Sequence, residues 1–321
     1  MVDYSEVVTR PPLTVERLRS FAPDDVLYRD AGVPAWLDEL DLKVAPPHLK
    51  MGTHSLATED CLVVDQFRDM EVALRNRLLD EEHDTVFAAL PSADDASQEV
   101  LELVGEHLAR AGVTPPNAVA ARHPLEVAGR AVQEDLCLMI PRDGGWFLDA
   151  GVLCFPTIWS LAAKLGRPTS EVHGTVVHYA GELAERVDRY FDAFRPGRAV
   201  WRRNLSIKPF PLLYLPVTKA AQPVGVLACD DDGAPFWLRT ERQTLQRLPR
   251  SGAILFTIKL QLAPAAVLRQ RPDRARDLVE MYRSWDAAMW DYKVASNDLA
   301  PGFIPWLTRL GTDAETARNS H

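Results

Sequence analysis

Cysteine is scarce in this chain, and its spacing argues against the usual cysteine-based metal sites. The 321 residues include four cysteines, and no two of them form a Cys-x-x-Cys pair. That spacing argues against structural zinc and against iron–sulfur clusters. We expect reduced, buried thiols at Cys61, Cys137, Cys154 and Cys229.

The sequence also lacks the features of nucleic-acid-binding and membrane proteins. Its formal net charge is −9 and no run of Lys and Arg forms a basic stripe, so we expect no nucleic-acid partner. No window approaches the roughly eighteen apolar residues of a membrane span, and the N-terminal MVDYSEVVTRPP does not resemble a secretion signal. We therefore expect a cytoplasmic protein with no membrane partner.

What is present is an ordinary globular composition, 47% hydrophobic and 25% charged, which allows a sizeable core. Apolar residues at helical spacing predict helices over 70–90, 97–111, 179–194 and 272–294. Apolar runs predict strands over 136–140, 146–155, 199–207, 212–217, 236–240 and 254–262, the first two joined as a hairpin by Asp-Gly. The fold class expected from this order is α+β, an antiparallel sheet with inserted helices.

We expect three regions along the chain. Residues 1–115 form an N-terminal wrap with helices, because paired prolines interrupt any long element before residue 50. The segment GVTPPNAVAARHP reads as a linker into residues 116–265, which hold the sheet. Residues 266–321 form a C-terminal helix that packs on the core, and the last eleven residues, GTDAETARNSH, are expected to be disordered.

The most informative stretch is FPTIWSLAAKLGRPTSEVHGTVVHY, residues 155–179. It predicts the end of a strand, a short helix around Trp159, a left-handed C-cap at Gly166 and a stop at Pro168. A polar bend over 169–171 should then deliver His173 in an extended segment. From the residues alone, a lone histidine among apolar neighbours is more often a structural residue than a metal ligand.

Seven residues of this stretch favour His173 as a metal ligand over a structural histidine. They fit a pattern of Phe-Pro-x-x-Trp, then Lys-Leu-Gly, then a histidine, and through them the chain resembles the heme-dependent oxidative N-demethylase family. The matching residues are Phe155, Pro156, Trp159, Lys164, Leu165, Gly166 and His173. The segments VQEDLCLM, VWRRNLSI and TERQTLQRLP resemble the same family and extend the resemblance over about residues 50–262.

Three positions depart from the family pattern. Residues 175–177, Thr-Val-Val, stand in place of Pro-Val-Pro, and Cys61 and Leu205 stand where the family has tryptophan. The shorter Leu205 predicts a smaller cavity wall. Because of these departures, a simple dimethylated amine and a biosynthetic amine or amino acid are equally open as substrate.

The resemblance implies a PAS-like sheet that binds heme b, with His173 as the iron ligand and His178 as its rival. TERQTLQRLP, taken as a turn-like segment, would contribute Arg242 and Arg247 to the heme propionates, or these two could merely pair with Glu241 or Asp232. The expected cofactor-binding residues are His173, Arg202, Arg242, Arg247 and Trp159, and the expected catalytic residues are Glu134, Asp135, Arg203, Asn204 and Gln243.

Several of these residues are neighbours in sequence, which limits how many can face one site. On a strand only one of Arg202 and Arg203, and one of Glu134 and Asp135, faces a given side. The carboxylate directed inward could bind an ammonium group or relay protons. From the residues alone, Glu134 and Asp135 could equally lie in a solvated turn before the strand.

The implied activity is that of a monooxygenase that uses O2 to oxidise an amine or amino-acid-like substrate at or next to nitrogen, as in oxidative N-demethylation. The chain has no Gly-x-Gly-x-x-Gly turn and no cysteine cluster, so electrons should come from an external flavin or iron–sulfur reductase. The alternative is a heme-binding PAS-like sensor or carrier without turnover.

Overall fold

A seven-stranded antiparallel sheet forms the centre of the molecule. The computed structural model describes residues 15–42, 52–117, 119, 121–143, 145–172, 182–216, 236–285 and 300–318. The strands run in the order β1-β5-β6-β7-β3-β4-β2. They are β1 His54–Leu56, β2 Phe87–Ala89, β3 Asp135–Arg142, β4 Gly145–Val152, β5 Ala199–Lys208, β6 Trp237–Arg247 and β7 Ile254–Pro264.

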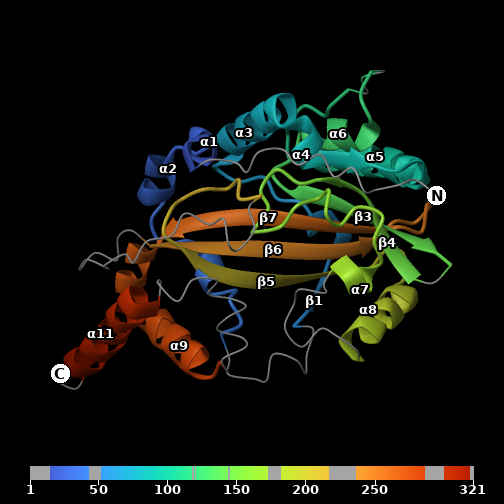
Figure 1. Ribbon diagram of the computed structural model, residues 1–321. Coiled ribbons are helices and arrows are strands. Elements are labelled where there is room, and N and C mark those ends of the chain that lie inside the picture. The colour runs from blue at the N-terminus through green and yellow to red at the C-terminus, as the bar shows by residue number, and fades with distance from the viewer. Residues whose placement is uncertain are drawn as a thin grey trace.

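Helices lie around this sheet in three groups (Figure 1). One group precedes β3 and lies above the sheet in that view: α1 Val15–Ser20, α2 Asp25–Asp30, α3 Arg68–Glu81, α4 His83–Val86, α5 Asp94–Arg110 and α6 Pro124–Gly129. The second group, α7 Thr169–Val172 and α8 Glu182–Ala193, is inserted between β4 and β5. The third is C-terminal, α9 Pro272–Arg283 and α11 Ala300–Arg318. Short 3-10 turns are η1 Ala35–Leu37, η2 Thr58–Asp60, η3 Pro91–Ala93 and η5 Ala265–Gln270.

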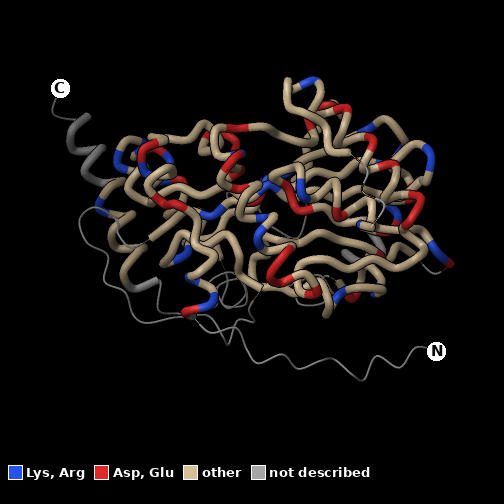
Figure 2. Tube along the Cα trace, turned by 90° about the horizontal axis from the view of Figure 1, so that it is seen from above, with Lys and Arg blue, Asp and Glu red and all other residues tan. Residues whose placement is uncertain are grey.

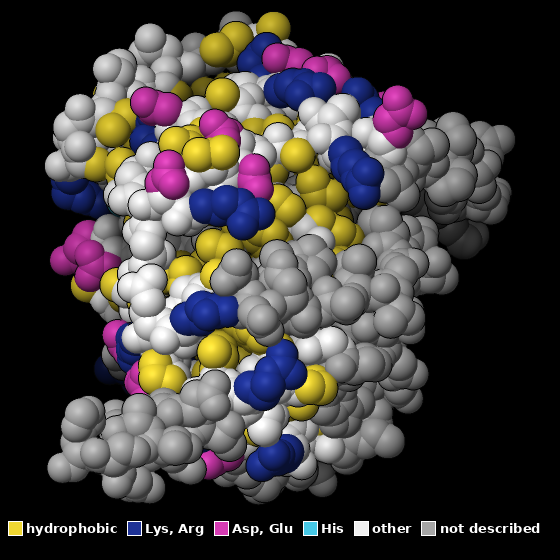
Figure 3. Space-filling model, turned by 90° about the vertical axis from the view of Figure 1, so that its left-hand side faces the viewer, with side chains coloured by type: hydrophobic (Ala, Val, Ile, Leu, Met, Phe, Trp, Pro, Cys, Tyr) yellow, Lys and Arg dark blue, Asp and Glu magenta, His cyan; other side chains and the backbone are white. Residues whose placement is uncertain are grey.

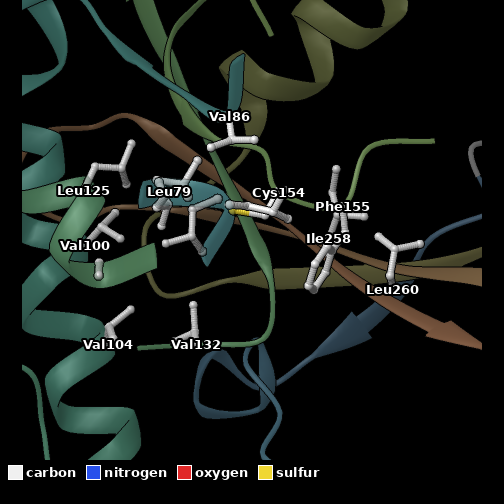
Figure 4. Close-up of a cluster of buried hydrophobic side chains, with 14 of the residues drawn as sticks. Leu79, Val86, Val100, Val104, Leu125, Val132, Cys154, Phe155, Ile258 and Leu260 are labelled. Carbon is white, nitrogen blue, oxygen red and sulfur yellow. The ribbon is translucent and has the colours of Figure 1, made fainter. Parts of the chain in front are cut away.

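The largest core cluster lies between the first helical group and the sheet. It includes Leu79 of α3, Val100 and Val104 of α5 and Leu125 of α6, which surround Cys154 and Phe155 (Figure 4). Close approach is required here, because a Cβ on Gly129 would lie 2.6 Å from a methyl group of Val152. Burial of this apolar surface is the main source of stability for the region.

Two smaller clusters cover other parts of the sheet. One joins η1, α9 and α11 to β5, β6 and β7, and includes Trp36, Leu238, Leu278 and Trp306. The other joins α8 to β3, β4 and β7. Lys and Arg side chains lie among hydrophobic ones on the left-hand side of the molecule (Figure 3). Among the described residues, no helix is long and apolar enough to cross a membrane.

The structure confirms the α+β class and the expected hairpin, since Arg142 of β3 pairs with Gly145 of β4. Gly166 adopts the predicted left-handed conformation, with φ of 73°, and Gly112, with φ of 72°, follows the end of α5. Pro272 lies in the first turn of α9, where its missing N–H costs nothing.

Several expected elements are wrong. The predicted helix over 70–90 ends earlier, at Glu81 for α3, and its last apolar residues form strand β2 beside β4. The predicted helix around Trp159 is a series of turns, and the bend over 169–171 is the short helix α7. The prediction of a disordered tail is wrong as far as Arg318, because helix α11 extends to that residue. Trp306 and Leu307 of this helix are buried in the cluster with α9.

Two errors concern strands near the site. Residues 212–216 form no strand: Leu215 makes only an isolated bridge to Thr157, and the carbonyls of Leu212 and Leu213 accept hydrogen bonds from Arg239. TERQTLQRLP is not turn-like. Strand β6 continues through Arg247, paired with β5 and β7 along its length.

Arg239, on β6, is fully buried and joins the sheet to two irregular segments. Its guanidinium donates to the carbonyls of Phe155 (3.0 Å) and Pro156 (3.1 Å) and to the Thr157 hydroxyl (3.0 Å). It also donates to the carbonyls of Leu212 and Leu213, at 2.5 and 3.0 Å. Burial lowers the pKa of Arg239 to about 10, which leaves it charged at neutral pH. The side chain therefore replaces the strand neighbours that these segments lack.

We predict that Arg239→Lys destabilises the protein by at least about 3 kcal/mol, because a lysine leaves several buried carbonyls without donors. The free energy of unfolding in urea measures this loss. The control is Arg167→Gln, which removes an exposed guanidinium paired with Glu171 and should change stability by less than about 1 kcal/mol. Equal stability of the two variants would contradict the role given to Arg239.

Candidate functional site

The two faces of the sheet carry different sets of the expected site residues. Because paired residues of antiparallel strands share a face, Arg202, Gln243, Ile258 and Asp135 lie in one row. We call their side the Gln243 face. Arg203, Arg242 and Lys259 form a row on the opposite side, the Arg242 face. The expectation that Arg202 and Arg203 face opposite ways is confirmed.

A chain of hydrogen bonds crosses the Gln243 face. Arg202 Nε donates to Gln243 Oε1 at 2.7 Å, and Gln243 Nε2 donates to Glu241 Oε2 at 2.7 Å. Glu241 Oε1 accepts from the Thr157 hydroxyl at 2.5 Å, and this hydroxyl accepts from buried Arg239. The chain thus runs from an exposed guanidinium to a buried one, with the Glu241 carboxylate between them.

Beside this polar chain, apolar side chains of the same face are only partly buried. Leu245, Phe256 and Val200 pair across three strands and pack at the margin of the cluster with α8. Trp159 is partly buried against the same cluster. Partly exposed apolar and aromatic groups beside a few fixed polar ones are typical of a small-molecule or cofactor site.

Asp135 lies at the edge of this row but is fully committed to protein contacts. Its carboxylate accepts from Arg75 at 2.7 Å and from the backbone N–H groups of Cys154 (2.7 Å) and Phe155 (3.1 Å). The side chains of Asp135 and Arg75 are both inaccessible to solvent. Burial raises the pKa of Asp135, and Arg75 opposes this effect. Asp135 therefore holds the start of the 155–159 segment in place.

Asn204, another of the expected catalytic residues, also lies on the Gln243 face. It pairs with Glu241 of β6, and its carbonyl accepts from the Thr240 hydroxyl at 2.8 Å. Arg247, at the far end of β6, donates to the carbonyls of Gly252 and Phe194 and lies over the Trp146 ring at 5.4 Å. These contacts place Arg247 against the cluster with α8.

The Arg242 face holds the other expected residues. Arg242 donates to the carbonyls of Asp60 and Cys61, at 2.8 and 3.3 Å, and so fixes the segment that crosses this face. Arg203 pairs with Glu39 at 2.6 Å and donates to Gln261. In contrast to the pairing considered from the sequence, neither Arg242 nor Arg247 uses Glu241, which lies on the Gln243 face with Thr157 and Gln243 as partners.

His173 and His178, the two histidines proposed as iron ligands, lie outside the described residues. The nearest described residue, Val172, ends α7 and is buried in the cluster with α8. The chain therefore enters the His173 segment from the side of α8 and β4. The assignment of His173 stays a prediction.

Sequence reasoning missed Thr157 and Arg239 and gave Glu241 only a pairing role. Thr157 lies within the Phe-Pro-x-x-Trp pattern, and Glu241 within TERQTLQRLP, so both were in segments already singled out. Arg239 had no such signal, because its partners in residues 155–157 lie more than 80 positions away in the sequence. Only the three-dimensional fold brings these groups together.

Charged residues are distributed along the described part of the trace, including the middle of the molecule (Figure 2). One buried group surrounds Lys259, whose ammonium contacts Glu71 and lies 3.4 Å from Asp65. Glu71 also accepts from the Tyr28 hydroxyl and from Gln133. This group ties α2 and α3 to the free half of β7.

Glu134 lies at the margin of this buried group. One carboxylate oxygen accepts from the Val63 N–H at 2.8 Å, and the other has no hydrogen-bond partner. Burial raises the pKa of Glu134 to about 7, an effect that nearby Lys259 reduces. Glu134 therefore takes up a proton near neutral pH.

We predict that titration of the Glu134 carboxyl lowers the free energy of unfolding as pH rises from about 4.5 to about 7. The raised pKa means that the folded state favours the protonated acid, so stability is lost over this interval and is constant above it. The full effect is about 3 kcal/mol at most. Glu134→Gln should remove it, and the difference in unfolding free energy between wild type and variant at pH 5 and pH 8 measures it. Glu102→Gln, at an exposed carboxylate paired with Arg250, is the control. Parallel pH curves for wild type and Glu134→Gln would contradict this role.

A comparison with protein families covers the strands that carry these residues. A family model described as haem-dependent oxidative N-demethylase, alpha subunit-like, matches residues 111–298. The match spans β3 to β7, and so includes both strands that supply the Arg202–Gln243 pair. The match covers more than half of the sequence, and the chain belongs to the haem-dependent oxidative N-demethylase alpha-subunit-like family.

Proposed function

We propose that this protein binds heme b against the Gln243 face and oxidises an amine at a carbon bonded to nitrogen, with O2 as oxidant and electrons from an external reductase. The observation that carries the proposal is the Arg202–Gln243 hydrogen bond. This bond joins VWRRNLSI to TERQTLQRLP, two segments that each resemble the family, and its two residues are 41 positions apart. Partly exposed apolar groups lie beside it. The family match over residues 111–298 supports a haem-dependent oxidative activity.

The residues of the Gln243 face fit a heme. A porphyrin is flat and apolar and needs apolar walls, which Trp159, Leu245 and Phe256 can supply because they are not fully buried. Its propionates need cations or amide donors when they leave water. Arg202 is exposed and its guanidinium is oriented by Gln243, so it is suited to a propionate at the rim.

Bound heme supplies the reaction with O2 and the oxidation of the carbon next to nitrogen. The chain supplies binding and orientation. Glu241 is the carboxylate best placed for the substrate: it is 8% exposed, fixed by Thr157 and Gln243, and close to the apolar wall. A carboxylate there can accept an N–H of a cationic amine and hold its nitrogen in one place.

We assign the other expected catalytic residues as follows. Asn204, which pairs with Glu241, contributes to the same site from β5. Asp135 is a positioning residue, since its carboxylate holds the backbone of the 155–159 segment. Glu134 and Arg203 lie away from the Gln243 face and act on packing rather than on the substrate.

The first test is the absorption spectrum of the protein after heme supplementation, oxidised, reduced and reduced under carbon monoxide. We expect a stoichiometric Soret band that shifts with carbon monoxide and lacks the red shift of a thiolate ligand. An amine screen should then reveal a substrate that accelerates O2 consumption and releases formaldehyde. Stoichiometric heme without any turnover would favour a sensor or carrier, and no stoichiometric heme would overturn the proposal.

His173→Ala is predicted to lower heme affinity at least tenfold, since it removes the proposed bond to iron. The measurement is a heme titration followed at the Soret band. His178→Ala is the matched control, at the other histidine of the same segment. If His178→Ala loses heme and His173→Ala does not, the ligand is His178; if both retain full loading and an unchanged Soret band, neither histidine binds the iron.

A pair of arginines tests which face binds heme. We predict that Arg202→Ala lowers heme affinity about tenfold, the loss of one charge-assisted contact to a propionate. Arg242→Ala should leave heme affinity within about twofold of wild type, because its donors contact backbone carbonyls on the opposite face. The reverse result would move the heme to the Arg242 face.

A further inference from the structure

Lys164 is a partly buried lysine for which no anionic partner is found among the described residues. Its ammonium lies 4.8 Å from the centre of the Trp159 ring, and burial lowers its pKa. Among the described residues, no carboxylate forms an ion pair with it. Lys259 provides the contrast: it is fully buried and contacts Glu71 and Asp65, and these carboxylates raise its pKa.

The position of Lys164 is fixed by its own segment. The N–H of Lys164 donates to the Leu161 carbonyl at 2.9 Å, and the N–H of Gly166 donates to the Leu148 carbonyl of β4 at 2.7 Å. Leu161 is fully buried and packs on Gly151, where an added Cβ would lie 2.9 Å from it. The turn from 161 to 166 is therefore held on the sheet.

The surroundings of Lys164 belong to the proposed heme site. Lys164 lies near the neutral thiol of Cys137, and Cys137 lies on the Gln243 face in one row with Phe256 and Leu245. Three strand spacings, about 14 Å, separate the strand positions of Cys137 and Arg202. The partly exposed apolar row thus has a cation near each end.

A cation–π contact with Trp159 offsets only part of the cost of removing an ammonium from water. The backbone of residues 161–166 is held on the sheet, which keeps the base of the Lys164 side chain beside Trp159. The ammonium is therefore available to an anion that enters the site. An oxygen anion with an apolar body suits both the ammonium and the adjacent indole ring.

We propose that Lys164 binds a carboxylate at the Gln243 face, either a propionate of heme or the carboxylate of an amino-acid-like substrate. This inference rests on the proposed function, because it takes the apolar row as the place where heme and substrate bind. It assigns Lys164, with Trp159, to recognition of the carboxylate. Arg202 lies in the neighbouring row, two residues from Val200 on β5, and supplies a cation beyond the other end of the apolar row.

Titrations of wild type and Lys164→Gln with heme and with heme dimethyl ester test whether Lys164 binds a heme propionate. If Lys164 binds a propionate, the variant should bind heme about tenfold more weakly and should bind the diester as wild type does. Lys164→Arg should recover most of the affinity. Arg167→Gln, which removes an exposed charge three residues away, should match wild type with both ligands.

Binding of a substrate carboxylate is tested on heme-loaded protein with two probes, dimethylamine and N,N-dimethylglycine, each followed by its perturbation of the Soret band. If Lys164 binds a substrate carboxylate, Lys164→Gln should lower the affinity for N,N-dimethylglycine about tenfold and leave the affinity for dimethylamine unchanged. Wild-type affinities in both sets of titrations would overturn this inference alone. Failure of the wild-type protein to bind heme would overturn the proposed function and this inference together.

Discussion

The guanidinium of Arg239 is the group on which the site depends most. A buried cation is costly unless its donors are used, and the five hydrogen bonds of Arg239 end on backbone and hydroxyl oxygens of two segments that lack strand partners. Those segments cover the Gln243 face. One side chain thereby fixes the backbone at 155–157 and, through Thr157, the orientation of the Glu241 carboxylate. Stability and site geometry are coupled at this residue.

The 155–159 segment is held from both ends and is strained between them. Asp135 accepts from the N–H groups of Cys154 and Phe155, and the Ile158 N–H donates to the Leu215 carbonyl at 3.0 Å. Ile158 has φ of 62°, a conformation that a β-branched residue adopts only when its surroundings impose it. The chain leaves this residue directly into Trp159. The strain is therefore associated with placing the aromatic ring at the Gln243 face.

The sequence was informative where one local pattern decides the structure, and misleading where distant contacts do. The hairpin of β3 and β4 and the glycine stops followed from turn chemistry. The later part of strand β6, beyond the predicted 236–240, was hidden in TERQTLQRLP because both of its faces carry polar side chains, so no apolar alternation marks it. The hydrogen bond of Arg202 to Gln243 was invisible for a different reason: each residue was identified in its own segment, but only strand pairing shows that they meet.

The faces of the sheet also decide what the departures from the family pattern mean. Leu205 pairs with Thr240 and packs at the margin of the cluster formed by η1, α9 and α11, on the Arg242 face. The expected smaller cavity wall at Leu205 is therefore wrong for the Gln243 face. The backbone of Cys61 contacts Arg242 and Thr257 on that same opposite side. These two positions lie where the C-terminal helices and the N-terminal segment pack on the sheet, and neither one argues for or against a simple dimethylated amine. Substrate choice is instead expected to depend on the side chains that border the apolar row, Glu241 and Lys164 among them.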